Sequence, residues 1–114
     1  MKVVKLESSV KKSNSKNCVI TDYCFNSPYM DLVMADIEGR YPNIGYCVNE
    51  NCDEIAFIID GKVTISYKDN QSFELSKSDA VLISKGEQYF WNGTCKMLIT
   101  CSPSWYPEQY KIIK

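Results

Sequence analysis

The sequence contains no histidine. Imidazole is the commonest metal ligand in proteins and the usual base near neutral pH, so its absence excludes Ser-His-Asp and Cys-His triads and every zinc site that includes histidine. The chain also has no Cys-x-x-Cys pair, which leaves no zinc knuckle and no thioredoxin-type motif. Any chemistry in this chain therefore depends on carboxylates, phenols, amides and thiols.

An excess of charge of either sign is missing too. The 13 basic and 14 acidic residues give a net charge of −1, which predicts no binding to nucleic acid or to an acidic membrane surface. No apolar run approaches the length of a membrane span, and Met1–Leu6 is too short and too charged for a signal peptide. We therefore expect a cytoplasmic protein with no nucleic-acid or membrane partner.

The chain has six cysteines, an even number that would suggest disulfides in a small secreted protein. Without a signal sequence, we expect reduced thiols that pack in the core as small apolar side chains. The six are Cys18, Cys24, Cys47, Cys52, Cys95 and Cys101.

The length of 114 residues predicts one domain. We expect an edge strand at Val3–Leu6 and a polar loop at Lys11–Asn17 within residues 1–17, a barrel over 18–102 and a tail over 103–114. About eight or nine short strands at this spacing indicate a closed barrel or a sandwich, because closure removes exposed edges. The expected barrel strands are Cys18–Phe25, Met30–Glu38, Glu54–Asp60, Lys62–Lys68, Ser72–Leu75, Ala80–Ser84, Glu87–Trp91 and Lys96–Cys101.

Three turns separate these strands. Asn26-Ser-Pro28 is typical of a hairpin-like turn, and Asp69–Gln71 predicts another. Asp60-Gly61 is the strongest hairpin signal, because both central residues of a type I′ turn need a positive φ. The strand before it, Glu54–Asp60, is almost wholly apolar, so we expect it to be covered on both faces.

Residues Gly45–Gly61 resemble the first conserved motif of the cupin family, which is usually His-x-His, four residues, Glu, six residues and Gly. Here Glu54 and Gly61 keep the last interval, while Cys47 and Asn49 stand at the histidine positions. The resemblance implies an all-β fold of the cupin type, a double-stranded β-helix or jelly-roll barrel with its ligand cavity between two sheets.

A later stretch is similar to the second cupin motif, which is usually Gly, five residues, Pro-x-Gly, two residues and His. Gly86 is kept, while Ser78, Ser84 and Tyr89 replace the Gly, the Pro and the His. The ending, Cys101–Gln109, is similar to that of small, stand-alone cupins that have also lost the histidines. The chain is therefore identified as a small single-domain cupin with histidine-free metal motifs.

In typical cupins three imidazoles and one carboxylate bind a divalent metal ion. The resemblance places Cys47, Asn49, Glu54 and Tyr89 at those four positions. At pH 7 the phenol and the thiol must lose protons at a cost of about 4 and about 2 kcal/mol, and the amide offers only a neutral oxygen. We therefore expect no metal and no other cofactor. The same four residues, with Trp91, become the candidate ligand-binding residues.

Glu54 and Tyr89 are also the candidates for catalysis. A carboxyl that faces an apolar interior should have a raised pKa and can act as an acid or base near neutrality, although it could instead be satisfied by Asn49, Tyr89 or a buried water. The first hypothesis is a metal-free binder of a small polar or carbohydrate-like ligand. The alternatives are a metal-independent isomerase or epimerase with Glu54 and Tyr89 as acid and base, and a metal-dependent enzyme that uses the substituted ligands.

Two further expectations concern the surface. Trp105 and Tyr106 lie in a proline-flanked tail, where we expect them to cap one end of the barrel or to meet a second subunit. The edge strand expected at Val3–Leu6 could pair with a second copy, so we predict a homodimer.

Overall fold

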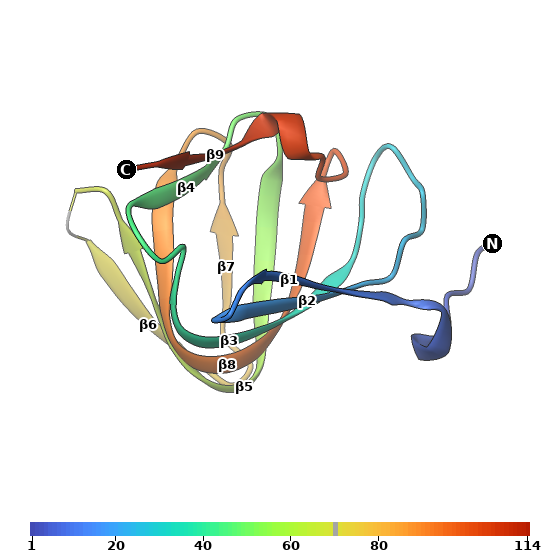
Figure 1. Cartoon of the computed structure of the whole chain (residues 1–114), viewed down its shortest axis with the longest axis horizontal. Coiled ribbons are helices and arrows are strands. Elements are labelled where there is room, and N and C mark those ends of the chain that lie inside the picture. Colours follow the sequence, from blue (N-terminus) through green and yellow to red (C-terminus); the bar gives the residue numbers. More distant parts are fainter. Residues whose placement is uncertain (70) are drawn as a thin grey trace.

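The computed structural model describes residues 1–69 and 71–114, and most of them form strands (Figure 1). The prediction of an all-β fold is confirmed. Among the described residues, helical structure is limited to two short 3₁₀ turns, η1 (Leu6–Ser8) and η2 (Pro107–Gln109), and no helix is long and apolar enough to cross a membrane. The strands are β1 (Val10–Ser15), β2 (Cys18–Asp22), β3 (Val33–Tyr41), β4 (Tyr46–Asn49), β5 (Asp53–Tyr67), β6 (Ser72–Ser76), β7 (Ala80–Ile83), β8 (Gln88–Ser102) and β9 (Tyr110–Ile113).

The barrel is organised by β5 and β8, two strands of 15 residues that pair antiparallel from one end to the other. Both bend near their middle, so the sheet folds into a U (Figure 1). β7 pairs with the first half of β5 and β6 with the second half, and we call these two sides the β7 arm and the β6 arm. β3, β2 and β1 extend the sheet from the other edge of β8, while β4 pairs with the start of β8 and carries β9.

The prediction of a hairpin at Asp60-Gly61 is wrong. β5 continues through this dipeptide without reversing, and its pairing with β8 shifts register between Ile58 and Asp60. Gly61 has a φ of +85°, and a Cβ at this position would lie 2.2 Å from the backbone oxygen of Thr94. Glycine is therefore required because the bend brings the two backbones together. A glycine with a positive φ is found in such bulges as well as in hairpin turns, so the sequence signal does not distinguish the two.

The partner strand β8 also joins two segments that the sequence separates, 87–91 and 96–101. Gly93 lies between them, and a Cβ there would lie 2.5 Å from the backbone oxygen of Lys62 on β5. The polar residues of this stretch therefore belong to a bent strand and not to a loop.

The expectation that Glu54–Asp60 is covered on both faces is also wrong. Ile55 and Phe57 are 47% and 40% exposed, while Ala56 and Ile58 are completely buried. The side chains alternate between solvent and interior, as expected for a strand with one free face.

Both ends of the chain differ from expectation. Residues Val3–Leu6 form no strand; the edge strand is β1, which occupies most of the predicted loop Lys11–Asn17 and pairs with β2. β1 is exposed along nearly all its length, so it needs no apolar face, and lysines suit an open sheet edge. At the other end, the predicted tail over 103–114 contains η2 and β9.

Two predicted turns remain. Asn26-Ser-Pro28 lies within the connection of residues 23–32 between β2 and β3, which pair antiparallel; the chain reverses here as predicted, although the connection is longer than the predicted turn. The predicted turn at Asp69–Gln71 includes Asn70, which lies outside the described residues.

The apolar core lies on the concave side of the folded sheet. Ile58, Val63, Ile65, Ile83 and Met97 are among its most deeply buried side chains. All six cysteines are free and five are buried, as expected for reduced core thiols; the exception is the exposed Cys24.

Candidate functional site

Polar side chains of the interior gather on the concave side of the U. Glu54 begins the β7 arm of β5, and strand alternation turns it inward with Ala56 and Ile58. Tyr89 comes from the start of β8 on the β6 arm, and Asn49 from the end of β4. The fold thus brings three of the predicted site residues together from three strands.

Glu54 is the centre of this group and is only 6% exposed. Its Oε1 accepts hydrogen bonds from Asn49 Nδ2 at 3.2 Å, from Tyr89 OH at 3.4 Å and from the thiol of Cys101 at 3.8 Å. The same phenol lies 3.5 Å from Oε2. Because donors usually approach an ionised carboxylate to about 2.5–2.9 Å, the nitrogen and oxygen contacts are long. The carboxyl therefore keeps capacity for further hydrogen-bond donors.

Burial raises the pKa of the Glu54 carboxyl from 4.5 to about 7, because the ionised form loses its water. Hydrogen bonds from Asn49, Cys101 and Tyr89 act in the opposite direction. Burial also raises the pKa of the Tyr89 phenol well above 10, and the charge of Glu54 adds to this effect. Near neutral pH the phenol is therefore a protonated donor, while the carboxyl is present in both forms.

A second layer of hydrogen bonds supports Asn49. Its Oδ1 accepts from Gln109 Nε2 at 2.9 Å, and Gln109 is itself 3% exposed. The Gln109 Oε1 accepts from the backbone N–H groups of Asn51 and Cys52 at 3.1 and 3.2 Å. The orientation of the Gln109 amide is thus fixed by the backbone, and it in turn directs the N–H₂ of Asn49 towards Glu54.

The two remaining predicted ligand-binding residues, Cys47 and Trp91, contact Tyr89. Cys47 lies opposite Tyr89 in the pairing of β4 with β8, and its thiol donates to the Tyr89 carbonyl at 3.4 Å. The buried ring of Trp91 packs edge-on against the Tyr89 ring, with the centroids 6.0 Å apart. These two side chains therefore contact Tyr89, and neither is among the described hydrogen-bond partners of the Glu54 carboxyl.

The donors at the four cupin metal positions do not fit a metal ion. Burial raises the pKa of the Cys47 thiol to about 12 and raises the pKa of the Tyr89 phenol well above 10, so both groups stay protonated at neutral pH. The Oδ1 of Asn49 is already bonded to Gln109. In the part of the chain that the structure describes, no three histidine, cysteine or acidic side chains are grouped so as to hold an ion. No metal chemistry is therefore assigned to this site.

Sequence reasoning missed two members of the site. Cys101 lies directly opposite Glu54 in the pairing of β5 with β8, so only the strand register could have found it. Gln109 follows a stretch without strand periodicity and reaches the interior from η2. Trp105 and Tyr106 precede Gln109, and each is 39% exposed. The Trp105 ring packs against the Tyr110 ring, with the ring centroids 5.6 Å apart.

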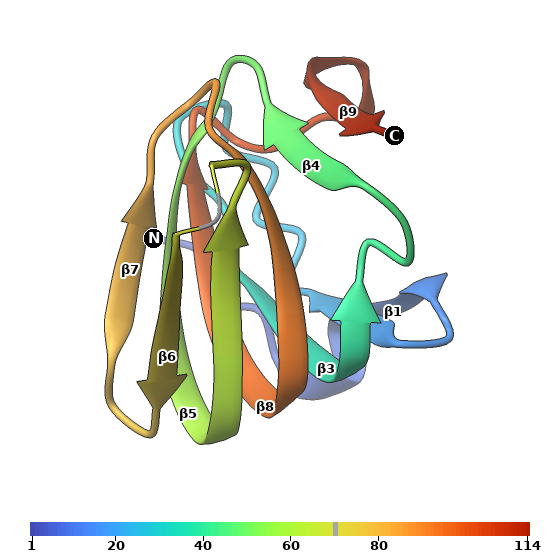
Figure 2. The ribbon, with the colours of Figure 1, turned by 90° about the vertical axis from the view of Figure 1, so that its left-hand side faces the viewer.

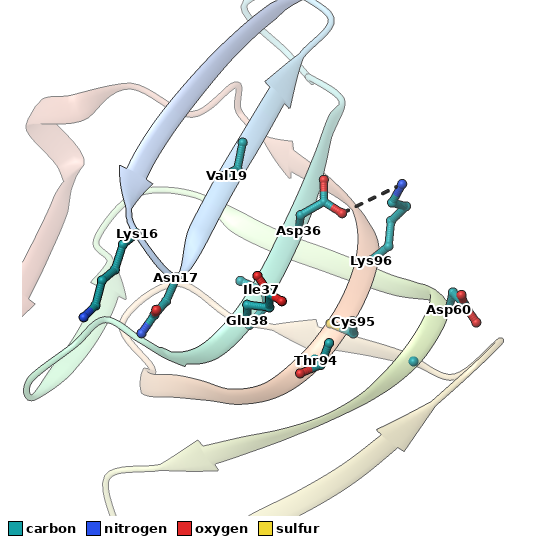
Figure 3. A pocket seen from close by; sticks show the side chains of 11 residues that line it. Lys16, Asn17, Val19, Asp36, Ile37, Glu38, Asp60, Thr94, Cys95 and Lys96 are labelled. Atoms are coloured by element: carbon teal, nitrogen blue, oxygen red, sulfur yellow. Dashed lines mark ion pairs between the residues drawn. The ribbon is translucent and has the colours of Figure 1, made fainter.

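Two open grooves lie beside this interior. The first, of about 460 Å³, runs along the base of the U between the β1–β2 turn and the bend of β5 (Figure 3). It is lined by exposed charges of both signs, including Lys96 and Asp36, which pair at 3.8 Å. The second, of about 510 Å³, lies at the edge of the barrel between β6 and β7. The lining of neither groove includes Glu54.

Comparison with known proteins identifies the family of this chain and solved structures that share its fold. The sequence profile of the EutQ-like cupin domain matches residues 45–109, more than half of the chain. The chain belongs to this family, and the cupin-type barrel expected from the two motifs is confirmed. No curated protein matches the sequence.

Solved structures with the same fold include three small proteins at 13% identity. A variant of Streptomyces PAC13 with uridine aligns with a TM-score of 0.89 over 100% of this chain and 91% of its own, and Pac13 is described as a nucleoside dehydratase. The polyketide cyclase RemF from Streptomyces resistomycificus aligns at 0.77, over 100% and 86%. KdgF from a Halomonas species aligns at 0.75, over 91% and 96%. At this identity the likeness shows the fold alone.

Proposed function

We propose that this protein is a metal-free cupin that binds a small polar or carbohydrate-like molecule between the arms, with Glu54, Asn49 and Tyr89 as its polar contacts. The observation that carries the proposal is the buried Glu54 carboxyl, whose nitrogen and oxygen contacts are all 3.2 Å or longer. A ligand hydroxyl could donate a shorter bond to this carboxyl, and a buried charge-assisted bond of this kind favours binding.

The fold neighbours support the ligand class. PAC13 has been solved with uridine, whose ribose carries hydroxyl groups that can donate to a carboxyl. Because Tyr89 stays protonated, its phenol can donate to the same sugar, while the Asn49 amide is directed inward by Gln109. The site thus offers one acceptor and two donors, a combination suited to hydroxyl groups.

A metal-independent isomerase or epimerase is the second candidate. A pKa of about 7 lets Glu54 accept a proton at neutral pH, and Tyr89 OH, within 3.5 Å of both carboxyl oxygens, could supply one. In such a reaction Glu54 would be the base and Tyr89 the acid.

Thermal unfolding with added probes tests the proposal. Uridine, D-ribose and D-glucuronate are added at millimolar concentration to the wild type, to Glu54→Gln and to Glu7→Gln, a control that removes an exposed carboxylate in η1. We expect at least one probe to raise the Tm of the wild type and of the control, and to have less effect on Glu54→Gln. No shift with any probe would overturn the proposal.

The same variants separate binder from enzyme. Proton exchange or epimerisation of a bound probe, followed by NMR in D₂O, would favour the enzyme if Glu54→Gln abolishes it. A probe that binds and stays chemically unchanged would favour the binder.

The homodimer remains a prediction, but the strand that would pair with the second copy is a different one. The open edge that could pair with a second copy is β1 and not Val3–Leu6. Light scattering coupled to gel filtration measures the mass, and a monomer would end this prediction.

A further inference from the structure

The groove between β6 and β7 opens at one edge of the barrel. Both strands pair with β5 and are joined by one turn (Figure 2). A groove of about 510 Å³ lies between them at this edge. A volume of this size is within the range of small-molecule sites. The lining residues are Tyr67, Ser72, Phe73, Glu74, Leu75, Ala80, Val81 and Leu82.

Aromatic and aliphatic side chains dominate the groove. The rings of Tyr67 and Phe73 meet edge to face, with centroids 5.8 Å apart, and Phe73 is 48% exposed although strand pairing puts it opposite the buried Ile65. Leu75 is buried below them, and Val81 contributes from the β7 side. An exposed ring that faces the inside of a barrel is a surface that a flat apolar group can cover.

Strand register connects this groove to the Glu54 group. On the β6 arm, Tyr67 lies directly opposite Tyr89; on the β7 arm, Ile83 lies directly opposite Glu54. Residues opposite one another in adjacent strands share a face of the sheet. Tyr67 therefore lines the groove and also neighbours Tyr89, which contacts Glu54. On the other arm, Ile83 neighbours Glu54 and directly follows the groove residue Leu82.

We infer that this groove is the second half of the ligand site, and that it takes a planar, uncharged ring attached to the hydroxylated part that reaches Glu54. The inference rests on the proposed function. Tyr67 and Phe73 would contact the ring, and Tyr67 would be displaced when the ligand passes from the edge to the interior. Glu74 is the one ionisable acidic residue in the described lining, so a negatively charged ring substituent is disfavoured.

Titration calorimetry with uridine and D-ribose tests the inference. We expect the wild type to bind uridine about tenfold more tightly than ribose, because a covered aromatic contact is worth about that much. Phe73→Ala should remove this advantage and leave ribose affinity unchanged. The matched control is Phe57→Ala, which removes a ring of similar exposure from the outer face of β5 and should change neither affinity.

The outcomes separate this inference from the proposed function. If neither probe binds the wild type, the proposed function fails. If uridine binds but Phe73→Ala leaves its affinity unchanged, the groove is not part of the site, and the proposed function stands. A measurement on the wild type covers the case in which Phe73→Ala does not fold: NOEs from uridine H5 and H6 to the rings of Tyr67 and Phe73 are expected, and NOEs confined to other residues would overturn the inference.

Discussion

Gln109 donates from Nε2 to Oδ1 of Asn49 over 2.9 Å, and this bond decides which end of the Asn49 amide faces Glu54. The Oε1 of Gln109 is occupied by two backbone N–H groups, so the Gln109 amide cannot turn over without leaving buried donors unpaired. The result is a fixed N–H donor beside a buried carboxyl. Such a donor stabilises the ionised form and keeps the carboxyl pKa from rising further.

Replacement of Gln109 by methionine should release the Asn49 amide. We expect the Glu54 pKa to rise above about 7, and the free energy of unfolding to fall by about 2–4 kcal/mol because two backbone N–H groups lose their acceptor. The pKa is measured from the ¹³C shift of the Glu54 side-chain carboxyl, and stability from urea denaturation. Tyr106→Phe, which removes the exposed hydrogen bond to Asn51, is the control and should leave the pKa unchanged. A Glu54 pKa that does not move in Gln109→Met would contradict the positioning role.

Glu54→Gln should change how stability depends on pH. Between pH 4.5 and about 7 the folded protein holds a proton that the unfolded chain has released, so wild-type stability falls as pH rises through this window and is level above it. Across this window the titration of Glu54 lowers the free energy of unfolding by about 3 kcal/mol. Urea denaturation at pH 5 and pH 8 measures it.

In Glu54→Gln this component should be absent, while the exposed-site control Glu7→Gln should keep it. Equal pH dependence in the wild type and in Glu54→Gln would show that the carboxyl is hydrated and not buried.

The candidate site could be predicted only as far as motif spacing reaches. The resemblance to the two cupin motifs placed Glu54, Asn49 and Tyr89 together, because those motif positions face the interior in the family; periodicity alone did not. Cys101 and Gln109 are about 47 and 55 residues from Glu54 in sequence, and pairing across β8 and the path of η2 bring them to it. No local pattern encodes those contacts.

Gly61→Ala tests the close approach at the bend. Its φ of +85° already disfavours a side chain, and the added Cβ would meet the backbone oxygen of Thr94 at 2.2 Å. We expect a loss of at least about 3 kcal/mol, measured by urea denaturation. Gly86→Ala is the matched control, because its φ of +88° is similar but nothing lies within 4 Å of the added Cβ. It should cost only about 1 kcal/mol, and equal losses would mean that contact with β8 is unimportant.

Thiol reactivity should single out Cys24. This residue is exposed and the other five cysteines are buried, and burial raises the pKa of Cys47 to about 12. Ellman's reagent at pH 8.5 is expected to modify one thiol rapidly in the native protein and six in denaturant. Cys24→Ser should remove the rapid phase. Several rapid phases in the native protein would show that the interior thiols are accessible.

The fold was predictable in class but not in its connections. Alternating apolar residues and turn residues indicated many short strands, and the prediction of an all-β barrel is confirmed. Gly61 shows why the connections were missed: a glycine with positive φ can reverse a chain or bend it, and the choice depends on whether a second long strand lies alongside. The lysines of β1 show the opposite case, since a strand exposed at a sheet edge lacks the apolar alternation that marks a strand in sequence.

The two 15-residue strands have a mechanical consequence for ligand entry. β5 and β8 each run without interruption through both arms, and β3 pairs with β8 across the bend, so moving the arms apart would require three paired strands to straighten together. If a ligand binds at Glu54 as proposed, we expect it to enter by rearrangement of side chains at an edge or of the segments that carry β4 and β9. Substitutions of those rim residues would then alter the rate of entry while the affinity of the polar contacts stays the same.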